Sequence, residues 1–290
     1  MAGPVRFFVA LVCAKSSASD PCHEDSFVRA IPLLLTLGLL TACSQSPTGR
    51  SQVLLFSEAD MQKLGETSFT QIKEQEKPSG NRSDIQYVQC ITDRLVAEIP
   101  AGYGQTQWEV VVFDSPQVNA FALPGGKVGV YSGLLKVADS ADQVAAVIGH
   151  EIAHVLARHS NERVSRSQLT NIGLSAADLA LGQSALRQPA MAALGLGVQV
   201  GYLLPYGREQ ESEADRLGLE LMSRAGFNPE QSLDLWRNMS AASSGKQPPE
   251  LLSTHPSHGT RIQELDAAMP AALALYQQAR AQGKTPACRR

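Results

Sequence analysis

Two histidines four residues apart constrain this chain more than any other feature of its sequence. His150 and His154 lie in residues 142–159, an apolar-rich segment with helical periodicity that follows a capping residue, Ser140. Residues i and i+4 share one face of an α-helix, so both imidazoles can bind one ion. Because neutral imidazole is a good zinc ligand, the spacing H-E-x-x-H predicts a zinc site on this helix.

Glu151 follows the first of these histidines directly and is the candidate general base. It lies next along the helical turn, where it can reach a water activated by the ion without binding the ion itself. The neighbours Val147, Ile148, Ile152 and Val155 are apolar. This setting argues against two chance histidines on a solvated surface.

A third ligand has to come from further along the chain. The sequence after His154 lacks the G-x-x-H that metzincins carry. His159 is five residues past His154, and on a continuous helix it is predicted to point elsewhere. A carboxylate from a second helix is therefore expected.

Residues 208–224 form such a helix and offer three candidates, Glu209, Glu211 and Glu213. Glu211 and Asp215 are four residues apart and face the same way. Glu211 can thus bind zinc while Asp215 accepts the free N–H of a ligand histidine and fixes its tautomer. Glu209 and Glu213 are interpreted as solvated helix charges.

The pattern along the chain predicts an α+β fold, mostly helical, with a small sheet beside the motif helix. Helical periodicity marks residues 57–76 and 84–99, and the chain is helical again after residue 132. Three short β-rich runs are expected at residues 108–113, 118–123 and 127–131. The uncharged residues 188–207 hold too many glycines and prolines for a spanning helix, so a buried or interfacial segment is expected.

Composition excludes other classes of protein. The chain has 290 residues, 43% hydrophobic and 18% charged, which is ordinary for a globular domain. Lys+Arg is 25 and Asp+Glu is 28, so no basic excess exists to neutralise phosphates, and aromatic residues are only 6%. Nucleic-acid partners are therefore not expected.

The N-terminal residues have the pattern of a targeting signal. Residues 31–40 are apolar but cover only about half of a bilayer core. The following Leu-Thr-Ala-Cys43 resembles a bacterial lipobox, which implies that residues 1–42 are a removed leader and that Cys43 is acylated. Residues 43–50 would then be a flexible tether, and Ser44 after the cysteine implies the periplasmic face of the outer membrane. The charged residues before this signal suggest a true start near Val28.

The remaining chain is divided into a metallopeptidase domain, residues 51–270, and a C-terminal helix and tail, residues 271–290. Two cysteines outside the leader and the lipobox remain, Cys90 and Cys288. They could pair in an oxidising compartment or be separate thiols, and the sequence leaves this open.

These motifs resemble the zinc metallopeptidase family that includes HtpX, BepA, LoiP and the CAAX prenyl proteases. The likeness runs from about Thr48 to Met269 and rests on residues 48–51 (T-G-R-S), 119–128, the H-E-x-x-H helix, 211–215 (E-S-E-A-D) and 254–256 (T-H-P). It implies a zincin-type fold, one Zn²⁺ per chain, and Glu211 as the third ligand in preference to Glu213. Because the chain has a lipobox and lacks hydrophobic hairpins, it most resembles the LoiP-type lipoproteins of that family.

The resemblance also implies roles outside the metal ligands. An edge strand beside the cleft would bind extended peptide through its main chain, which favours unfolded substrates. That strand maps to Asn119, Ala120, Phe121 and Ala122.

His255 and Arg261 match a second familial stretch. Either could stabilise the oxyanion formed when water attacks the peptide bond. Alternatively, His255 holds the open zinc position at rest and keeps the enzyme off. His258 is interpreted as a surface residue.

Together these observations predict a lipid-anchored periplasmic zinc endopeptidase. Its partners would be unfolded or misassembled envelope polypeptides, and the membrane through the anchor. The alternative is a chaperone-like or latent binding lipoprotein whose zinc site is occluded.

Overall fold

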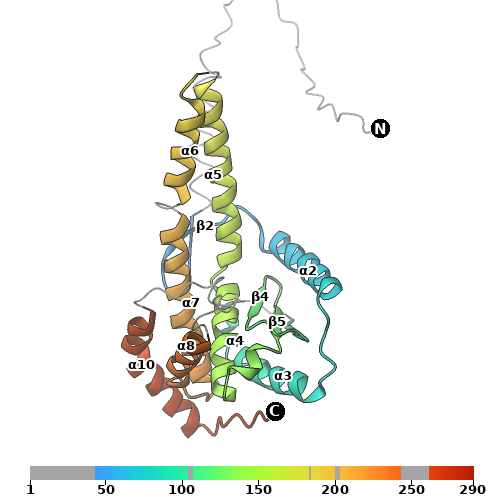
Figure 1. Ribbon diagram of the computed structural model, residues 1–290. Coiled ribbons are helices and arrows are strands. Elements are labelled where there is room, and N and C mark those ends of the chain that lie inside the picture. The colour runs from blue at the N-terminus through green and yellow to red at the C-terminus, as the bar shows by residue number, and fades with distance from the viewer. Residues whose placement is uncertain (1–42, 104–106, 183, 200–202, 243–260) are drawn as a thin grey trace, which may run out of the picture. The chain divides into compact units, whose positions relative to one another are not determined.

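Helices form most of the chain in the computed structural model, which describes residues 43–103, 107–182, 184–199, 203–242 and 261–290. The elements, labelled as in Figure 1, follow in chain order: β1 (Cys43–Gln45), β2 (Ser51–Val53), α2 (Glu58–Gln75), α3 (Arg82–Val96), η1 (Ala101–Tyr103), β3 (Glu109–Phe113), β4 (Ala120–Leu123), β5 (Lys127–Tyr131), η2 (Leu134–Lys136), α4 (Ala141–Leu156), α5 (His159–Leu181), α6 (Arg187–Val198), α7 (Leu204–Arg224), α8 (Gln231–Ala242) and α10 (Arg261–Ala281). The predicted α+β class is confirmed.

The three predicted strands form one mixed sheet in the order β3-β5-β4. Strand β5 pairs in parallel with β3 and antiparallel with β4, so β4 lies at one edge. Opposite Phe121 of β4 lies Gly129 of β5. A Cβ on Gly129 would come within 2.3 Å of the Phe121 ring, so glycine is required for the ring to lie over the sheet.

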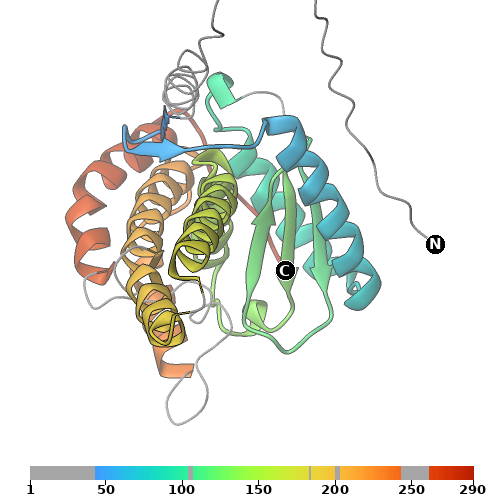
Figure 2. The same cartoon turned by 90° about the horizontal axis from the view of Figure 1, so that it is seen from above.

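Successive side chains along each strand point to opposite faces of the sheet, and both faces carry apolar residues, so both faces are covered. One face carries Phe113, Phe121 and Tyr131, which pack with Phe69 of α2. The other face contributes small and β-branched residues to the main core, shared with α3 and α4. Figure 2 shows α2 beside the strands.

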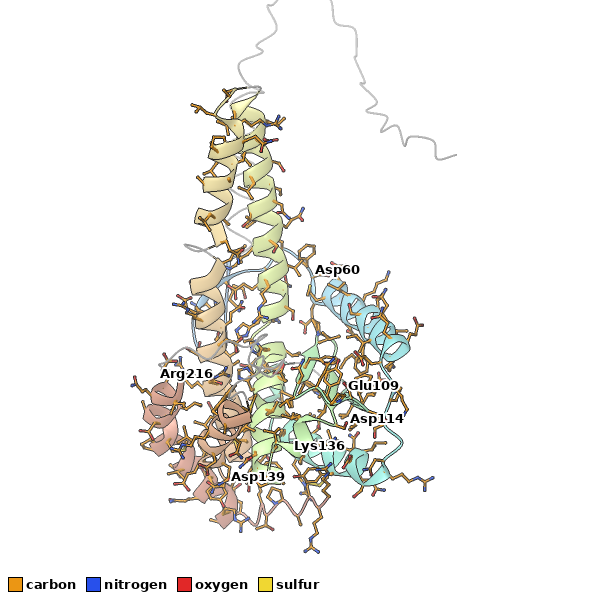
Figure 3. The ribbon with its side chains drawn as sticks, in the orientation of Figure 1. Asp60, Glu109, Asp114, Lys136, Asp139 and Arg216 are labelled. Atoms are coloured by element: carbon orange, nitrogen blue, oxygen red, sulfur yellow. A yellow bond between two sulfur atoms is a disulfide. The ribbon has the colours of Figure 1, made fainter. Side chains whose placement is uncertain are left out.

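Ion pairs fasten α2 to the sheet. Glu109 of β3, labelled in Figure 3, accepts hydrogen bonds from Lys73 of α2 at 2.7 Å and from Lys127 of β5 at 3.0 Å. The helix begins after Ser57, whose side chain forms a capping box with Asp60. The serine predicted to cap the motif helix, Ser140, also caps α4.

Helices α4 and α7 approach closely, and this contact positions the metal centre. A Cβ on Gly218 would lie 2.7 Å from the His150 backbone nitrogen, and one on Gly149 would lie 3.1 Å from the Gly218 carbonyl. Only glycine at position 218 permits this backbone approach. It brings Glu211 and Asp215, on the preceding two turns of α7, alongside His150.

The motif helix is shorter than predicted. Residues 142–159 do not form one helix: α4 ends at Leu156 and α5 begins at His159. Between them Arg158 has φ 55°, the only positive φ of a non-glycine residue in the described chain. This left-handed residue redirects the backbone, so His159 does not follow the periodicity of α4.

The residues predicted as a flexible tether are instead part of an ordered hairpin. Strands β1 and β2 pair antiparallel, with Cys43 opposite Val53. Residues 1–42, which the sequence assigns to the leader, lie outside the described chain.

The segment around α6 is exposed. No residue of α6 is buried, so of the two alternatives expected for this segment, buried or interfacial, the buried one is wrong for this helix. Leu179, Leu186 and Leu196 are among the exposed apolar side chains of α5, α6 and their connection. Among the described residues, no helix is long and apolar enough to span a membrane.

The C-terminus is tied back to the core. Cys90 of α3 and Cys288 form a disulfide, with Cα atoms 5.7 Å apart and 198 residues between them in sequence. The question left open by the sequence is thereby resolved in favour of pairing. Helix α10 runs from Arg261 to Ala281, so the predicted division after residue 270 falls inside one helix.

Candidate metal centre

Three buried side chains converge at the contact of α4 with α7. The Nε2 atoms of His150 and His154 are 3.1 Å apart. Glu211 Oε2 lies 3.3 Å from His150 Nε2, and Glu211 Oε1 lies 3.4 Å from His154 Nε2. The structure thus brings together the two motif histidines and the glutamate predicted as third ligand.

These separations fit zinc. Ligand atoms about 2.0–2.1 Å from a tetrahedral Zn²⁺ lie roughly 3.3–3.4 Å from one another. The observed distances, 3.1 to 3.4 Å, are close to that value. Two imidazoles with one carboxylate are also a donor set of catalytic zinc sites, which leave a fourth position open.

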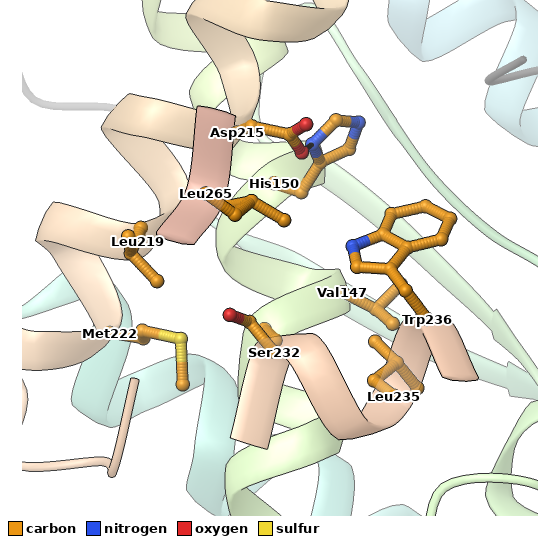
Figure 4. A pocket seen from close by; sticks show the side chains of 10 residues that line it. Val147, His150, Asp215, Leu219, Met222, Ser232, Leu235, Trp236 and Leu265 are labelled. Atoms are coloured by element: carbon orange, nitrogen blue, oxygen red, sulfur yellow. Dashed lines mark ion pairs between the residues drawn. The ribbon is translucent and has the colours of Figure 1, made fainter. Parts of the chain in front are cut away.

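On one side of the site, Asp215 holds His150. The Oδ1 atom of Asp215 is 2.9 Å from His150 Nδ1 and also accepts a hydrogen bond from the Arg261 guanidinium. Figure 4 shows the His150 ring and the Asp215 carboxylate facing each other. With Nδ1 protonated toward Asp215, His150 directs the lone pair of Nε2 at the proposed ion.

Burial raises the pKa of Asp215, but the Arg261 charge and the hydrogen bond with His150 outweigh burial and hold it below its ordinary value. Arg261 is buried, and its Cζ lies 3.7 Å from the centre of the Trp236 ring. This residue, predicted to stabilise the oxyanion, therefore contacts Asp215 and Trp236. Its oxyanion role stays a prediction.

On the other side of the site, His154 is hydrogen-bonded to His159, which is not one of the candidate ligands. Its Nδ1 lies 2.8 Å from Nδ1 of His159, and His159 Nε2 lies 3.1 Å from Glu213 Oε2. If His154 Nε2 faces the ion, its Nδ1–H donates to His159, whose Nε2–H then donates to Glu213. One arrangement of protons therefore satisfies every hydrogen bond from His154 through His159 to Glu213.

Two sequence interpretations are wrong here. His159 does not point elsewhere, because Arg158 turns the backbone and returns the ring to His154. Glu213 is not a solvated charge: it is 2% exposed, whereas Glu209 is exposed as expected. The sequence signal that marks this region is the change from apolar residues to the polar run 159–162.

The charges on this side are consistent with a neutral His159 and an ionised Glu213. Burial lowers the pKa of His159, against the opposing hydrogen bond with Glu213. Burial raises the pKa of Glu213, but hydrogen bonds from His159, Ser46 and Thr48 hold it far below its ordinary value. The neutral ring therefore faces a carboxylate.

Glu151 lies on α4 between the two ligand histidines and is buried, 3% exposed. It is not part of the three-residue ligand cluster. Its position is the one expected of a general base that does not bind the ion. His255 and His258 lie outside the described residues.

A small cavity adjoins His150 and Asp215, on the side of α7 and α8. It has a volume of about 20 Å³ and is lined mainly by apolar side chains (Figure 4). That is room for about one water molecule, so this cavity is not the site of a peptide.

The strand predicted to bind substrate is β4, which packs against α4. In the described part of the chain, β4 pairs with β5 alone, so its other edge has no strand partner. Asn119 caps the strand by accepting a hydrogen bond from the Ala120 N–H at 2.9 Å. Ala120 and Ala122 face the core and Phe121 the opposite face, so peptide binding here would use the main chain.

Comparison with known proteins relates this chain to a family of peptidases. The family model described as "Peptidase family M48" matches residues 83–269. The mitochondrial metalloendopeptidase OMA1 of Bos taurus is 34% identical over 256 residues, covering 83% of this chain and 49% of the relative. The OMA1 metalloendopeptidase of Schizosaccharomyces pombe is 38% identical over 190 residues, 64% of this chain and 53% of the relative.

A bacterial relative is the beta-barrel assembly-enhancing protease of Escherichia coli, 31% identical over 183 residues, 61% of this chain and 37% of the relative. The chain spans about half the length, or less, of these curated relatives. The matched residues include α4 and α7, and therefore all three candidate ligands.

Proposed function

Because this chain belongs to peptidase family M48, we propose that it is a zinc metalloendopeptidase that uses the site of His150, His154 and Glu211. The observation that carries the proposal is the convergence of three buried ligand atoms at 3.1 to 3.4 Å. Zn²⁺ in such a site supplies Lewis-acid activation of water and of the peptide carbonyl.

Residues of the chain would supply the proton transfer and the orientation of the ligands. Glu151 takes one proton from the attacking water, whose oxygen forms the new bond to the carbonyl carbon. As the C–N bond breaks, Glu151 returns that proton to the leaving amine. Asp215 and His159 keep the two ligand rings in the tautomers that binding requires.

The proposed substrates are unfolded or misassembled envelope proteins, bound in extended form along β4. An edge strand without a strand partner among the described residues supports this mode of binding. The name of the Escherichia coli relative, beta-barrel assembly-enhancing protease, supports a task in the envelope.

The proposed location is the periplasmic face of the outer membrane, with Cys43 as lipid anchor. The lipobox and Ser44 support it, and the Cys90–Cys288 disulfide is compatible with an oxidising compartment. Replacing Cys43 with Ala should abolish incorporation of labelled fatty acid and release the protein from the membrane fraction. Retention of label would exclude Cys43 as the acylated residue.

The activity is tested by incubating the purified chain with casein, an unfolded protein. Parallel samples contain the Glu151→Gln variant or a zinc chelator. Cleavage that disappears in both controls is the expected result. A wild type that binds one zinc per chain without cutting would instead favour the latent, binding lipoprotein. A wild type that binds no zinc would overturn the proposal.

A further inference from the structure

The N-terminal hairpin, residues 43–53, reaches the metal centre from the opposite end of the chain. Thr48 Oγ1 donates a hydrogen bond of 2.6 Å to Glu213 Oε1, across 165 residues of sequence. Arg50 Nε donates one of 3.0 Å to Glu213 Oε2. Ser46 of the hairpin and His159 also donate to Glu213, so four donors surround this carboxylate and three of them come from the hairpin.

The hairpin is itself firmly placed. Arg50 binds Glu162 of α5 with both terminal nitrogens, at 2.8 and 2.7 Å, and Glu162 is completely buried. Gln52 of β2 donates to the Ala157 carbonyl at 2.6 Å, in the connection between α4 and α5. A two-pronged Arg–carboxylate pair fixes geometry as well as charge, so Arg50 holds Glu162 and Glu213 in one arrangement.

We propose that Thr48 and Arg50 are positioning residues of the metal centre, acting on the ligand His154 through Glu213 and His159. The inference rests on the zinc site of the proposed function. It extends that site beyond α4 and α7 to a segment that precedes the family match, which begins at residue 83.

The hydrogen bonds give the effect its direction. Glu213 accepts from His159 Nε2, which requires the proton of His159 to be on that nitrogen and leaves Nδ1 as an acceptor. That acceptor is what His154 Nδ1–H needs in order to keep Nε2 directed at the ion. If Glu213 loses its donors from the hairpin, the carboxylate is free to rotate and His159 loses its preferred tautomer.

The size of the effect follows from similar sites. Removing a group that orients a metal-binding histidine lowers metal affinity by about 10–100-fold. Thr48 is two hydrogen bonds further from the ion than His159, so we expect its removal to cost only about 3–10-fold. Replacing His159 itself should cost the full amount.

The first experiment measures zinc affinity of the full chain by competition with a chromophoric chelator. Thr48→Val removes the hydroxyl at nearly constant shape, and Thr48→Ser restores it. The valine variant should bind zinc about 3–10-fold more weakly, and the serine variant within about twofold of wild type. The visible spectrum of the Co²⁺-loaded protein should change in the valine variant only. Unchanged affinity in Thr48→Val would overturn the proposal.

A double-mutant cycle tests whether the effect passes through His159. In a His159→Phe background, Thr48→Val should cause no further loss of zinc affinity, because the connection to His154 is already broken. An equal loss in both backgrounds would show that Thr48 acts by another route.

Arg50 requires a matched control, since its removal also leaves Glu162 without a charge partner. Arg166 is that control: it binds Glu162 Oε1 at 3.1 Å from within α5, whereas Arg50 binds both Glu162 and Glu213. Arg50→Met and Arg166→Met should both lower the melting temperature, but only Arg50→Met should weaken zinc binding. Equal weakening in both would assign the effect to general stability. A wild type that binds no zinc would instead defeat the proposed function and this inference together.

Discussion

His150 and His154 share one helix, yet they are held by different parts of the molecule. Asp215 contacts His150 directly and is itself paired with Arg261 of α10. His154 reaches its carboxylate, Glu213, only through His159. The same requirement, a fixed tautomer and ring orientation, is thus met by one hydrogen bond on one side and by two in series on the other.

The two sides also draw on different stretches of sequence. The His150 side uses α4, α7 and α10, which lie within or overlap residues 83–269 of the family match. The His154 side adds the hairpin at residues 48–50, before that match begins. The longer arrangement makes the metal centre depend on the segment next to the proposed lipid anchor.

Loss of the ligand shared by both sides should have the largest effect. Glu211 faces both histidines, so Glu211→Gln should lower zinc affinity by more than about 100-fold and abolish cleavage of casein. Zinc content of the purified variant, measured by mass spectrometry, checks this. Glu209→Gln, on the exposed face of the same helix, is the control and should match wild type. Full zinc occupancy in Glu211→Gln would exclude it as a ligand.

The next comparison separates the direct contact from the one in series. Asp215→Asn should weaken zinc binding by about 10–100-fold. It should also destabilise the fold by about 3–5 kcal/mol, because buried Arg261 loses a charge partner. Glu213→Gln should weaken zinc binding less than Asp215→Asn does. Chelator competition and urea unfolding measure the two effects, and a larger zinc loss in Glu213→Gln would reverse the comparison.

Stability of the zinc-free protein should depend on pH in opposite ways on the two sides. Burial disfavours the charge of His150, but its hydrogen bonds with Asp215 and Glu211 raise its pKa to about 9. The folded state then binds the proton more tightly than the unfolded one. This stability is fully present below pH 6.5 and is lost as pH rises toward 9. The loss amounts to a few kcal/mol, at about 1.4 kcal/mol per pKa unit.

Burial lowers the pKa of His159, so the unfolded state binds its proton more tightly and stability falls as pH drops below 6.5. Denaturant unfolding of zinc-free protein from pH 5 to pH 9.5 should show both trends. His150→Gln should remove the alkaline decline, and His159→Gln should reduce the acidic one. Identical pH profiles for wild type and both variants would contradict this assignment of charge.

The disulfide should affect neither side of the site. It closes 198 residues, so replacing Cys90 and Cys288 with Ser should cost about 2–5 kcal/mol of stability. Zinc affinity of the folded variant should remain within about twofold of wild type. A large loss of affinity would mean that the C-terminal connection positions the ligands as well.

The sequence was most informative where one helix carries the signal. His150, His154 and Glu151 follow from spacing on α4, and Asp215 from its spacing to Glu211 on α7. The strands at residues 109–131 followed from their β-branched and aromatic composition. Each of these predictions needs only local periodicity, which is the strongest signal in a single sequence.

What the sequence missed depends on contacts between distant segments. His159 was misplaced because one left-handed residue, Arg158, ends the helical periodicity between it and His154. Glu213 was misjudged because its partners Thr48 and Arg50 come from a segment interpreted as a flexible tether. No periodicity in residues 43–53 indicates where that hairpin binds.

The most direct test of the metal centre is anomalous X-ray diffraction at the zinc edge from crystals of the zinc-loaded chain. The geometry predicts one anomalous peak per chain, about 2.0–2.2 Å from His150 Nε2, His154 Nε2 and a Glu211 carboxylate oxygen. His159 and Glu213 should lie outside the coordination sphere, in the hydrogen-bonded order described. An anomalous peak within bonding distance of Glu213 or His159, or no peak between α4 and α7, would contradict the assignment of His150, His154 and Glu211 as the zinc ligands.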